Sequence, residues 1–172
     1  MIKIGITGSI ASGKTTVAKM LSRRKYPLFN ADKVVRKIYK NNIFKNKVYK
    51  KFKLKNKKSL KDLEKIIHPL VRREVRNFSK KNKRNKFVIF EIPLLIESKL
   101  MKNYDKIIFV NSKKSLRIRR FLKRGKNISI FNLLDKRQLP PAKKIKFCDY
   151  VINNNNSLNN LKKNVNSIIN KI

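Results

Sequence analysis

The sequence predicts an α/β protein of three layers, in which a five-stranded parallel sheet is flanked by helices. Short apolar runs of strand length alternate along the chain with longer segments of helical periodicity. Helices that follow strands in this way connect parallel neighbours and cover both faces of the sheet. The chain has 172 residues, 41% of them hydrophobic, which is about the length of one domain.

The first quarter of the chain contains the pattern strand, glycine-containing loop, helix. Residues 2–7 alternate like a strand, and residues 14–24 have the apolar spacing of an amphipathic helix. A second, short strand is predicted over 27–30. The spacing then predicts a helix over 33–51.

The middle of the chain is predicted to be a charged connector followed by a broken helix. Residues 53–58 are typical of a solvated connector, and Ser59 suits the N-cap of the helix that follows. The pair His68-Pro69 predicts an interruption of this helix, because proline lacks the backbone N–H that the helix needs. The helix is predicted to resume over 70–80.

The second half repeats the alternation of strand and helix. Its apolar runs are short enough for buried strands, and the first of them is closed by Pro93. The helical segments include a strongly basic one, SLRIRRFLKR. The predicted elements are strands at 87–92, 104–112 and 148–154, and helices at 115–124, 129–137 and 158–171.

Positive charge dominates the composition. The chain has 47 Lys and Arg residues against 9 Asp and Glu residues, a formal net charge of +38. Such an excess is typical of nucleic-acid-binding proteins, because lysine and arginine neutralise phosphates. It is also typical of AT-rich coding sequences, which are rich in Asn and Ile as well as Lys. We interpret the charge mainly as coding bias that also steers anions, so the functional prediction rests on motifs.

Neither a membrane segment nor a cysteine framework is predicted. No apolar run is long enough to span a membrane, and the N-terminus alternates like a strand instead of resembling a signal segment. Cys148 is the single cysteine, so it cannot form an internal disulfide, and we expect a small packing residue. These features predict a soluble, cytoplasmic protein.

The most specific motif is the stretch GSIASGKT, which begins at Gly8. It matches G-x-x-x-x-G-K-[ST] and lies between the first predicted strand and the first predicted helix, as a phosphate-binding loop must. In such a loop backbone N–H groups converge on phosphate oxygens, Lys14 acts as a catalytic residue at the β- and γ-phosphates of ATP, and Thr15 ligates Mg²⁺. The predicted nucleotide contacts are Gly8, Ala11, Ser12, Gly13, Lys14, Thr15 and Thr16.

A kinase also needs a carboxylate near the acceptor hydroxyl and positive charge over the transferred phosphoryl group. Asp32 follows the second predicted strand, at the sheet edge that binds ligands in such folds, although its position also suits a helix N-cap. Arg117, Arg120 and Arg124 share one helix face, which suits either a phosphate site or a solvated basic surface. Glu91 suits either a water-mediated Mg²⁺ site or a buried, paired carboxylate.

Several motifs occur together in the order of one known family. They are ITGSIASGKTTVA, NADKVVRKIY, LEKIIHPLVRREV, EIPLLIE with Glu97 at its end, SLRIRRFLKR and RQLPPAKKIKFCDYVINN. In these segments the chain resembles the bacterial dephospho-coenzyme A kinases. The resemblance spans nearly the whole chain and is more specific than the phosphate loop alone.

The resemblance implies a fold, a reaction and residue roles. The fold is that of a P-loop kinase, here a single domain with a helical acceptor-binding region over about 33–83 and a basic lid over about 113–145. The reaction is transfer of the ATP γ-phosphoryl group to the 3′-hydroxyl of dephospho-CoA, with Mg²⁺. Asp32 is implied as the catalytic base, and Arg120 and Arg124 as the catalytic lid arginines.

Further positions are implied by the same resemblance. Asp32, Pro93 and Leu94 are implied as acceptor contacts, and His68 as a structural or acceptor-positioning residue. The C-terminal motif of the family, a Gln, a basic residue, an Asp and an Asn, corresponds here to Gln138, Lys144, Asp149 and either Asn153 or Asn154.

The chain departs from the family pattern at four places. Ser9 and Ala11 stand where the family usually has glycine, so we expect a working loop of slightly altered geometry. Asn30 replaces the first acid of an Asp-Ala-Asp triplet, a change that we expect catalysis to survive. Pro141 stands where some members have arginine, and the segment 39–60 is shorter than usual.

Two other functions fit part of the sequence. A P-loop kinase for a nucleoside or nucleotide would share the loop and the arginines and would differ in its acceptor. A basic nucleic-acid-binding protein on the same scaffold would bind with steep salt dependence, although the chain lacks an aromatic-rich RNA platform. We expect ATP and dephospho-CoA as substrates, no specific nucleic acid and no membrane. The sequence leaves the oligomeric state open, and we expect a monomer.

Overall fold

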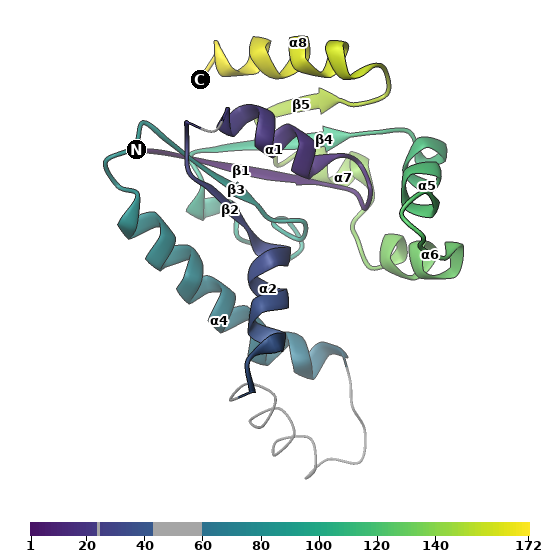
Figure 1. Cartoon of the computed structure of the whole chain (residues 1–172), viewed down its shortest axis with the longest axis horizontal. Helices are drawn as coiled ribbons and strands as arrows, with labels where there is room; N and C mark the ends of the chain where they lie inside the picture. Colours follow the sequence, from purple (N-terminus) through teal and green to yellow (C-terminus); the bar gives the residue numbers. More distant parts are fainter. Residues whose placement is uncertain (24, 43–59) are drawn as a thin grey trace. The chain divides into compact units, whose positions relative to one another are not determined.

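The structure is a computed structural model that describes residues 1–23, 25–42 and 60–172 (Figure 1). It divides into two compact units, one of Met1–Leu28 with Arg84–Ile172 and the other of Phe29–Lys83. The predicted connector at 53–58 and its cap Ser59 lie outside the described residues. No helix among the described residues has both the length and the apolar character that crossing a bilayer requires.

Five strands form one sheet in the order β2-β3-β1-β4-β5. β1 pairs in parallel with β3 and β4, and β4 pairs in parallel with β5. The predicted α/β fold is therefore confirmed, with small differences at the strand ends. The strands are β1 (Ile2–Gly8), β2 (Leu28–Asn30), β3 (Phe87–Glu91), β4 (Lys106–Asn111) and β5 (Tyr150–Asn153).

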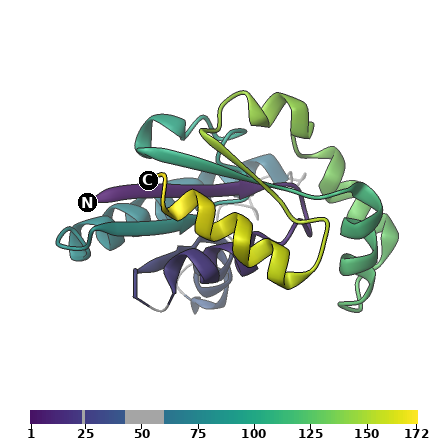
Figure 2. The ribbon, with the colours of Figure 1, turned by 90° about the horizontal axis from the view of Figure 1, so that it is seen from above.

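Two helices cover one face of the sheet, α1 (Lys14–Ser22) and α8 (Leu158–Ile169), as seen in purple and yellow in Figure 2. α8 buries Leu161, Val165 and Ile168, whose spacing of three and four residues places them on one helix face. These side chains join a core with alternate residues of the strands. That core includes Ile4, Ile6, Val17, Ala18, Leu21, Phe87, Ile89, Ile108, Val110 and Ile152.

The opposite face of the sheet is covered by η1 (Met101–Asn103), the chain around it, and α7 (Pro141–Ile145) (Figure 2). Buried Phe90 meets Tyr104 there, with ring centroids 5.5 Å apart. Apolar residues therefore occupy both faces of the central strands, which explains why the strands are continuous hydrophobic runs in the sequence.

Two helices follow β4 at the C-terminal end of the strands, α5 (Lys114–Leu122) and α6 (Ile128–Lys136) (Figure 1). Phe121 of α5 packs edge-on against Phe131 of α6, with ring centroids 5.5 Å apart. Gly125, at φ 68°, lies in the turn between the two helices. Both helices confirm the sequence prediction, whereas the short α7, which begins at Pro141, was not predicted.

The second unit contains α2 (Ala31–Lys40) and α4 (Leu60–Lys81), which contact each other. Asn30 is the N-cap of α2, because its side chain accepts a hydrogen bond of 2.8 Å from Lys33 N–H. The predicted helix over 33–51 is interrupted at Asn41, which has an extended backbone with ψ 123°. Its remaining part over 43–51 lies outside the described residues. Asparagine is a poor helix former, which fits the end of α2 before Asn41.

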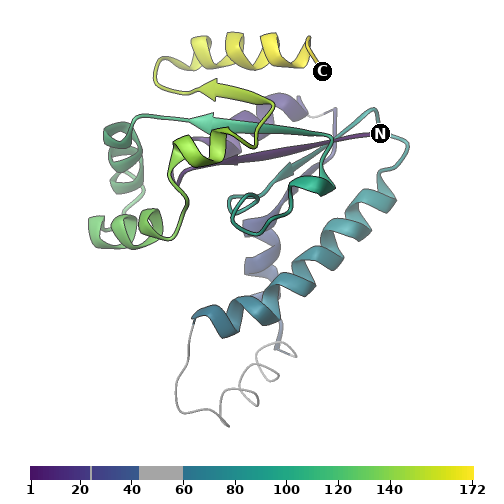
Figure 3. The same cartoon turned by 180° about the vertical axis from the view of Figure 1, so that it is seen from behind.

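α4 is one unbroken helix with Pro69 inside it (Figure 3). The predicted interruption at His68-Pro69 is therefore wrong. Proline has a backbone φ that suits a helix, and its defects there are the loss of one N–H hydrogen bond and the contact of its ring with the carbonyl four residues earlier. The helical pattern on both sides of Pro69, with buried Ile67 next to it, outweighs that defect.

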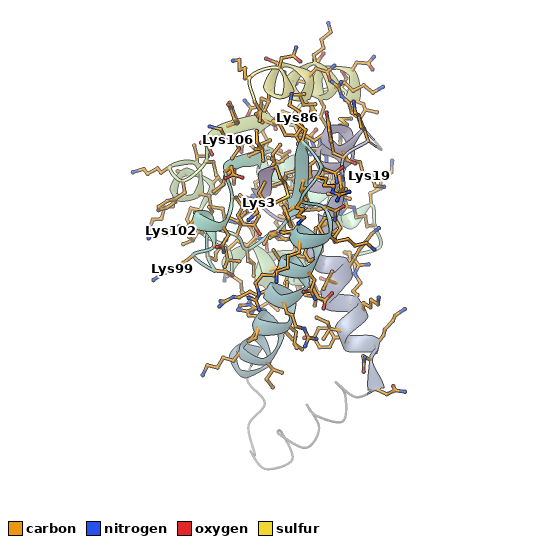
Figure 4. All side chains as sticks on the ribbon, turned by 90° about the vertical axis from the view of Figure 1, so that its left-hand side faces the viewer. Lys3, Lys19, Lys86, Lys99, Lys102 and Lys106 are labelled. Carbon is orange, nitrogen blue, oxygen red and sulfur yellow. The ribbon has the colours of Figure 1, made fainter. Side chains whose placement is uncertain are left out.

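Basic side chains also gather at the edge of the sheet where the strands begin (Figure 4). Ile2 is opposite Phe87, and Ile4 is opposite Lys106, so Lys3, Lys86 and Lys106 lie at the starts of neighbouring strands. This is the edge opposite the one where β1 meets the glycine-containing loop. The positive charge of the chain is therefore spread over the molecule and is not confined to that loop.

Candidate active site

The phosphate loop (residues 8–15) connects the C-terminal end of β1 to the start of α1. Because β1 lies between β3 and β4, the loop lies beside the C-terminal ends of these strands. The first N–H groups of α1 have no acceptor within the helix and point toward the loop. Such a concentration of N–H donors suits phosphate. The buried side chains are Ser9, Ser12 and Lys14, and Thr15 and Thr16 are exposed.

Two glycines allow the phosphate loop to approach its neighbours closely. Gly13, the residue before α1, has φ 96°, and a Cβ there would collide with Asn154 Nδ2. Gly8 has φ 152°, and a Cβ there would lie 2.5 Å from Val110 O of β4. The glycines of the motif are therefore required by backbone conformation and by space.

Ala11, in the middle of the phosphate loop, also has a left-handed backbone, with φ 57°. An L-residue reaches this conformation only at a cost in free energy, because its Cβ crowds the backbone. Ser9 is not among the residues of positive φ. Of the two positions where the resemblance leads us to expect glycine, only Ala11 therefore has a backbone that favours glycine.

Lys14 folds back over the phosphate loop. Its Nζ donates to Ser9 O at 2.8 Å and to Gly8 O at 3.1 Å, and the residue is only 8% exposed. The ammonium group is thus held over the loop that directly precedes α1. A phosphate bound by the loop N–H groups would compete with these carbonyl oxygens for the lysine.

Thr15 contacts an acid at the end of the neighbouring strand. Its Oγ1 donates to Glu91 Oε1 at 2.6 Å, and Glu91, the last residue of β3, is 3% exposed. Glu91 is therefore a buried carboxylate at the edge of the phosphate loop. A hydroxyl and a carboxylate side by side are the oxygen donors that Mg²⁺ prefers.

Arg120 of α5 is connected to the phosphate loop through Asn154. Its guanidinium donates to Ser112 Oγ and to Asn154 O, both at 2.9 Å. Asn154 in turn donates from Nδ2 to Ser12 O at 2.8 Å. Burial, and then the neighbouring positive charges of Arg119 and Arg124, lower the pKa of Arg120.

The other two arginines of the predicted basic face differ from Arg120. Arg117 is buried, and its Nη1 donates to Asp135 Oδ1 of α6 at 2.7 Å. Its guanidinium also lies 5.6 Å from the ring centroid of Phe131. Arg124 is exposed and follows the end of α5. Arg117 therefore joins the two helices to each other, whereas Arg124 faces solvent.

Gln138 contacts the phosphate loop directly. The sequence did not predict this contact. Its Oε1 accepts from Ile10 N–H at 2.9 Å across 128 residues. The next residue, Leu139, donates its N–H to Glu97 Oε1 at 3.0 Å. The segment after α6 is thus fastened both to the loop and to the chain that follows β3.

Glu97 also holds a buried lysine. Lys144 is fully buried, and its Nζ lies 2.5 Å from Glu97 Oε1, an ion-pair distance at which the angles are not those of a hydrogen bond. A buried charge needs such a partner, because leaving it unpaired in the interior is very costly. The sequence resemblance marked both positions without indicating that they meet.

Pro93 and Leu94 follow β3 and are half-buried. Pro93 O accepts a hydrogen bond of 3.0 Å from Thr7 Oγ1 of β1, which fixes the start of this segment beside the phosphate loop. The two predicted acceptor contacts therefore lie at the C-terminal edge of the sheet, where α/β proteins bind ligands.

Asp32 and His68 belong to the other unit, Phe29–Lys83. Asp32 is exposed in the first turn of α2. It is not the N-cap, because Asn30 has that role. His68 lies half-buried inside α4, directly before Pro69.

Cys148 fits its expected packing role. It is half-buried, and its Sγ donates to Lys144 O at 3.3 Å. Burial, with the adjacent charge of Asp149, raises the pKa of Cys148 to about 11, and Lys144 opposes the shift. Among the described residues, no group of three or more His, Cys, Asp and Glu side chains could hold a metal ion by itself.

Comparisons with known proteins identify the family of this chain. The sequence profile described as dephospho-CoA kinase matches residues 2–55 and 43–160. The chain belongs to the dephospho-CoA kinase family. It is 35% identical over 182 residues to the dephospho-CoA kinase of Fusobacterium nucleatum, with 94% of each chain covered. It is 32% identical to that of Aquifex aeolicus, covering 98% of this chain and 96% of the relative.

Solved structures extend the likeness of this dephospho-CoA kinase family member to three dimensions. TT1252 from Thermus thermophilus has a TM-score of 0.84 at 26% identity, covering 99% of this chain and 97% of that one. The dephospho-CoA kinase of Campylobacter jejuni has a TM-score of 0.65 at 26% identity, covering 98% and 96%. A shikimate kinase from Bacteroides thetaiotaomicron, 17% identical with a TM-score of 0.62 and coverage of 99% and 97%, shares the fold alone. The chain is thus an ATP-dependent phosphotransferase with a P-loop kinase fold.

Proposed function

We propose that this protein transfers the γ-phosphoryl group of ATP to the 3′-hydroxyl of dephospho-CoA, the last step of coenzyme A biosynthesis. The observation that carries the proposal is the family match, which extends over nearly the whole chain. The phosphate loop supports it physically, because its lysine, threonine and helix N-terminus are the parts from which a phosphoryl-transfer site is built.

In this proposal the phosphate loop holds the ATP phosphates. Its backbone N–H groups and the positive end of α1 attract phosphate oxygens. Lys14 exchanges its contacts with Ser9 O and Gly8 O for contacts with the β- and γ-phosphates. Transfer then depends mainly on holding the reactants in line and on stabilising charge in a loose transition state.

Thr15 and Glu91 are the residues that we propose to serve Mg²⁺. Their direct contact of 2.6 Å supplies a hydroxyl and a buried carboxylate in one place, which fits an ion that binds few protein ligands and keeps several waters. When bound, Mg²⁺ would neutralise charge on the phosphates. Thr15 would hold the ion directly, and Glu91 would act through water.

Asp32 is proposed to orient the acceptor hydroxyl and to accept its proton. Its support is the resemblance of NADKVVRKIY to the aspartate segment of the family and its place directly after a strand. A carboxylate is a weak base, so in a loose transition state orientation contributes more than proton removal. His68, Pro93 and Leu94 are proposed to help position dephospho-CoA.

The two lid arginines are proposed to act from different places. Arg120 supplies positive charge beside the phosphate loop, where Ser112 and Asn154 hold its guanidinium. Arg124 is exposed after α5 and would reach the phosphates when the lid closes. Closure would exclude water and thereby suppress hydrolysis of ATP.

The proposed partners are small molecules, ATP and dephospho-CoA, with no specific nucleic acid and no membrane. A monomer in the cytoplasm is the proposed working unit.

An acceptor comparison tests the proposal. The purified protein is incubated with Mg²⁺-ATP and either dephospho-CoA, adenosine or AMP, and products are identified by mass. We expect a product of the mass of coenzyme A from dephospho-CoA alone, and its loss in Lys14→Met, which excludes a contaminating kinase. Transfer only to adenosine or AMP would instead assign the protein to another class of small-molecule kinase.

A further inference from the structure

The strained residue of the phosphate loop is held from both sides. Ala11 has φ 57°, a conformation that residues with a Cβ adopt only when their surroundings enforce it. Ile10 N–H, before it, donates to Gln138 Oε1 at 2.9 Å. Ser12 O, after it, accepts from Asn154 Nδ2 at 2.8 Å. Two amide side chains from distant segments therefore hold the peptide groups Ser9–Ile10 and Ser12–Gly13, which lie one residue further out on either side of Ala11.

Asn154 is itself fixed by the surrounding structure. Its backbone N–H donates to Asn111 O at 2.8 Å, and its carbonyl oxygen accepts from Arg120 Nη2 at 2.9 Å and from Ser112 Oγ at 3.1 Å. Only 7% of the residue is exposed. The amide that holds Ser12 O is thus a rigid support, and it touches the loop where Gly13 leaves room for it.

Gln138 is anchored in a different way. It lies next to Leu139, whose N–H is bound by Glu97 Oε1, and Glu97 is in turn fixed by the fully buried Lys144. The two supports come from opposite ends of the segment that contains α7 and β5. They therefore reach the phosphate loop from different anchors.

We propose that Gln138 and Asn154 are positioning residues that hold the phosphate loop in its ATP-binding shape, in which Ala11 keeps a backbone that favours glycine. If Ala11 relaxed to a negative φ, the peptide groups around it would turn and their N–H donors would no longer converge. The proposal rests on ATP as the nucleotide of the proposed function. It assigns to these two amides a role in nucleotide affinity.

The test combines removal of each support with restoration of glycine. Gln138→Ala and Asn154→Ala are each made alone and with Ala11→Gly, and the dissociation constant of Mg²⁺-ATP is measured by calorimetry. Each single variant is expected to bind ATP roughly tenfold more weakly, the effect of one lost hydrogen bond of about 1.4 kcal/mol. Ala11→Gly should restore most of that affinity, because glycine adopts the left-handed backbone without the steric cost.

Asn153→Ala is the matched control. Asn153 is the exposed neighbour of Asn154, and its side chain accepts from Asn111 Nδ2 instead of touching the phosphate loop. Its ATP affinity should equal that of the unchanged protein. Gln138 lies in a half-buried turn, so Gln138→Ala remains a test even if Asn154→Ala fails to fold.

Unchanged ATP affinity in folded Gln138→Ala and Asn154→Ala would overturn the proposal. So would a loss of affinity that Ala11→Gly does not restore, because a general structural defect has no reason to be cured by glycine at this position. ATP binding needs no acceptor, so failure of the proposed function, with ATP bound but dephospho-CoA unmodified, is distinguishable from failure of this inference.

Discussion

At the scale of single residues, the role proposed for Asp32 predicts that its substitution affects phosphoryl transfer and leaves ATP binding intact. Asp32→Asn keeps the size of the side chain and removes its capacity to accept a proton. We expect turnover to fall by about a hundredfold to ten-thousandfold, the usual range for a positioned acid or base, with ATP affinity little changed. Steady-state rates and a separate ATP titration measure the two effects.

Asp105→Asn is the control for that substitution. Asp105 is also exposed, but it lies at the edge of the sheet where the strands begin, and its carboxylate accepts from Lys3 N–H at 2.7 Å. It loses the same charge without approaching the phosphate loop, so its turnover should be unchanged. Near-normal turnover in Asp32→Asn would remove Asp32 from the mechanism.

Cys148 offers a prediction about reactivity. Its pKa is raised from 9.0 to about 11 by burial, so the thiol remains protonated at pH 8. Because the thiolate is the nucleophile, we expect alkylation at pH 8 to be about a hundredfold slower in the folded protein than in urea, with the rate rising toward pH 11. Equal rates for iodoacetamide in the two states would contradict the burial of this thiol.

A local sequence motif predicts functional residues when they lie together in one contiguous segment. Gly8, Lys14 and Thr15 were predicted because the loop, the strand before it and the helix after it are contiguous. Gln138 and Asn154 contact the same loop from 128 and 142 residues away, and no local pattern encodes such a contact. The sequence could mark them as members of a motif, but only the fold shows what they touch.

At the scale of elements, the lid makes the sharpest prediction. Arg124→Ala should depress turnover on the order of a thousandfold if this arginine stabilises the transferred phosphoryl group, with a smaller effect on ATP binding. Arg119→Ala is the control, since Arg119 is an exposed arginine of the adjacent α5 to which we assign no catalytic role. Equal turnover in the two variants would reject the lid role of Arg124.

The strands and most helices were predictable because the spacing of apolar residues indicates which face of each element is buried. The prediction failed where a local rule was outweighed by its context. Pro69 was expected to interrupt a helix, yet α4 continues through it, and α2 ends at Lys40, within the helix expected over 33–51. The short α7 escaped prediction because its length is too small for a periodic pattern.

At the scale of the whole molecule, the net charge of +38 has a kinetic consequence. ATP and dephospho-CoA are anions, so a positive protein should attract them over several ångströms. We expect kcat/KM to fall when salt is raised from about 0.1 M to about 1 M, which shortens the screening length from about 10 Å to about 3 Å, while kcat changes little. A kcat/KM that is independent of salt would show that the charge does not contribute to capture of substrate.

The most direct test of the account is the position of the transferred phosphate. The protein is supplied with dephospho-CoA and ATP labelled with ¹⁸O in the γ-phosphoryl group, and the product is examined by mass spectrometry and ³¹P NMR. The account predicts one labelled phosphomonoester, located on the 3′-oxygen of the ribose. Labelled inorganic phosphate with unmodified dephospho-CoA, or a phosphate at another position, would contradict it.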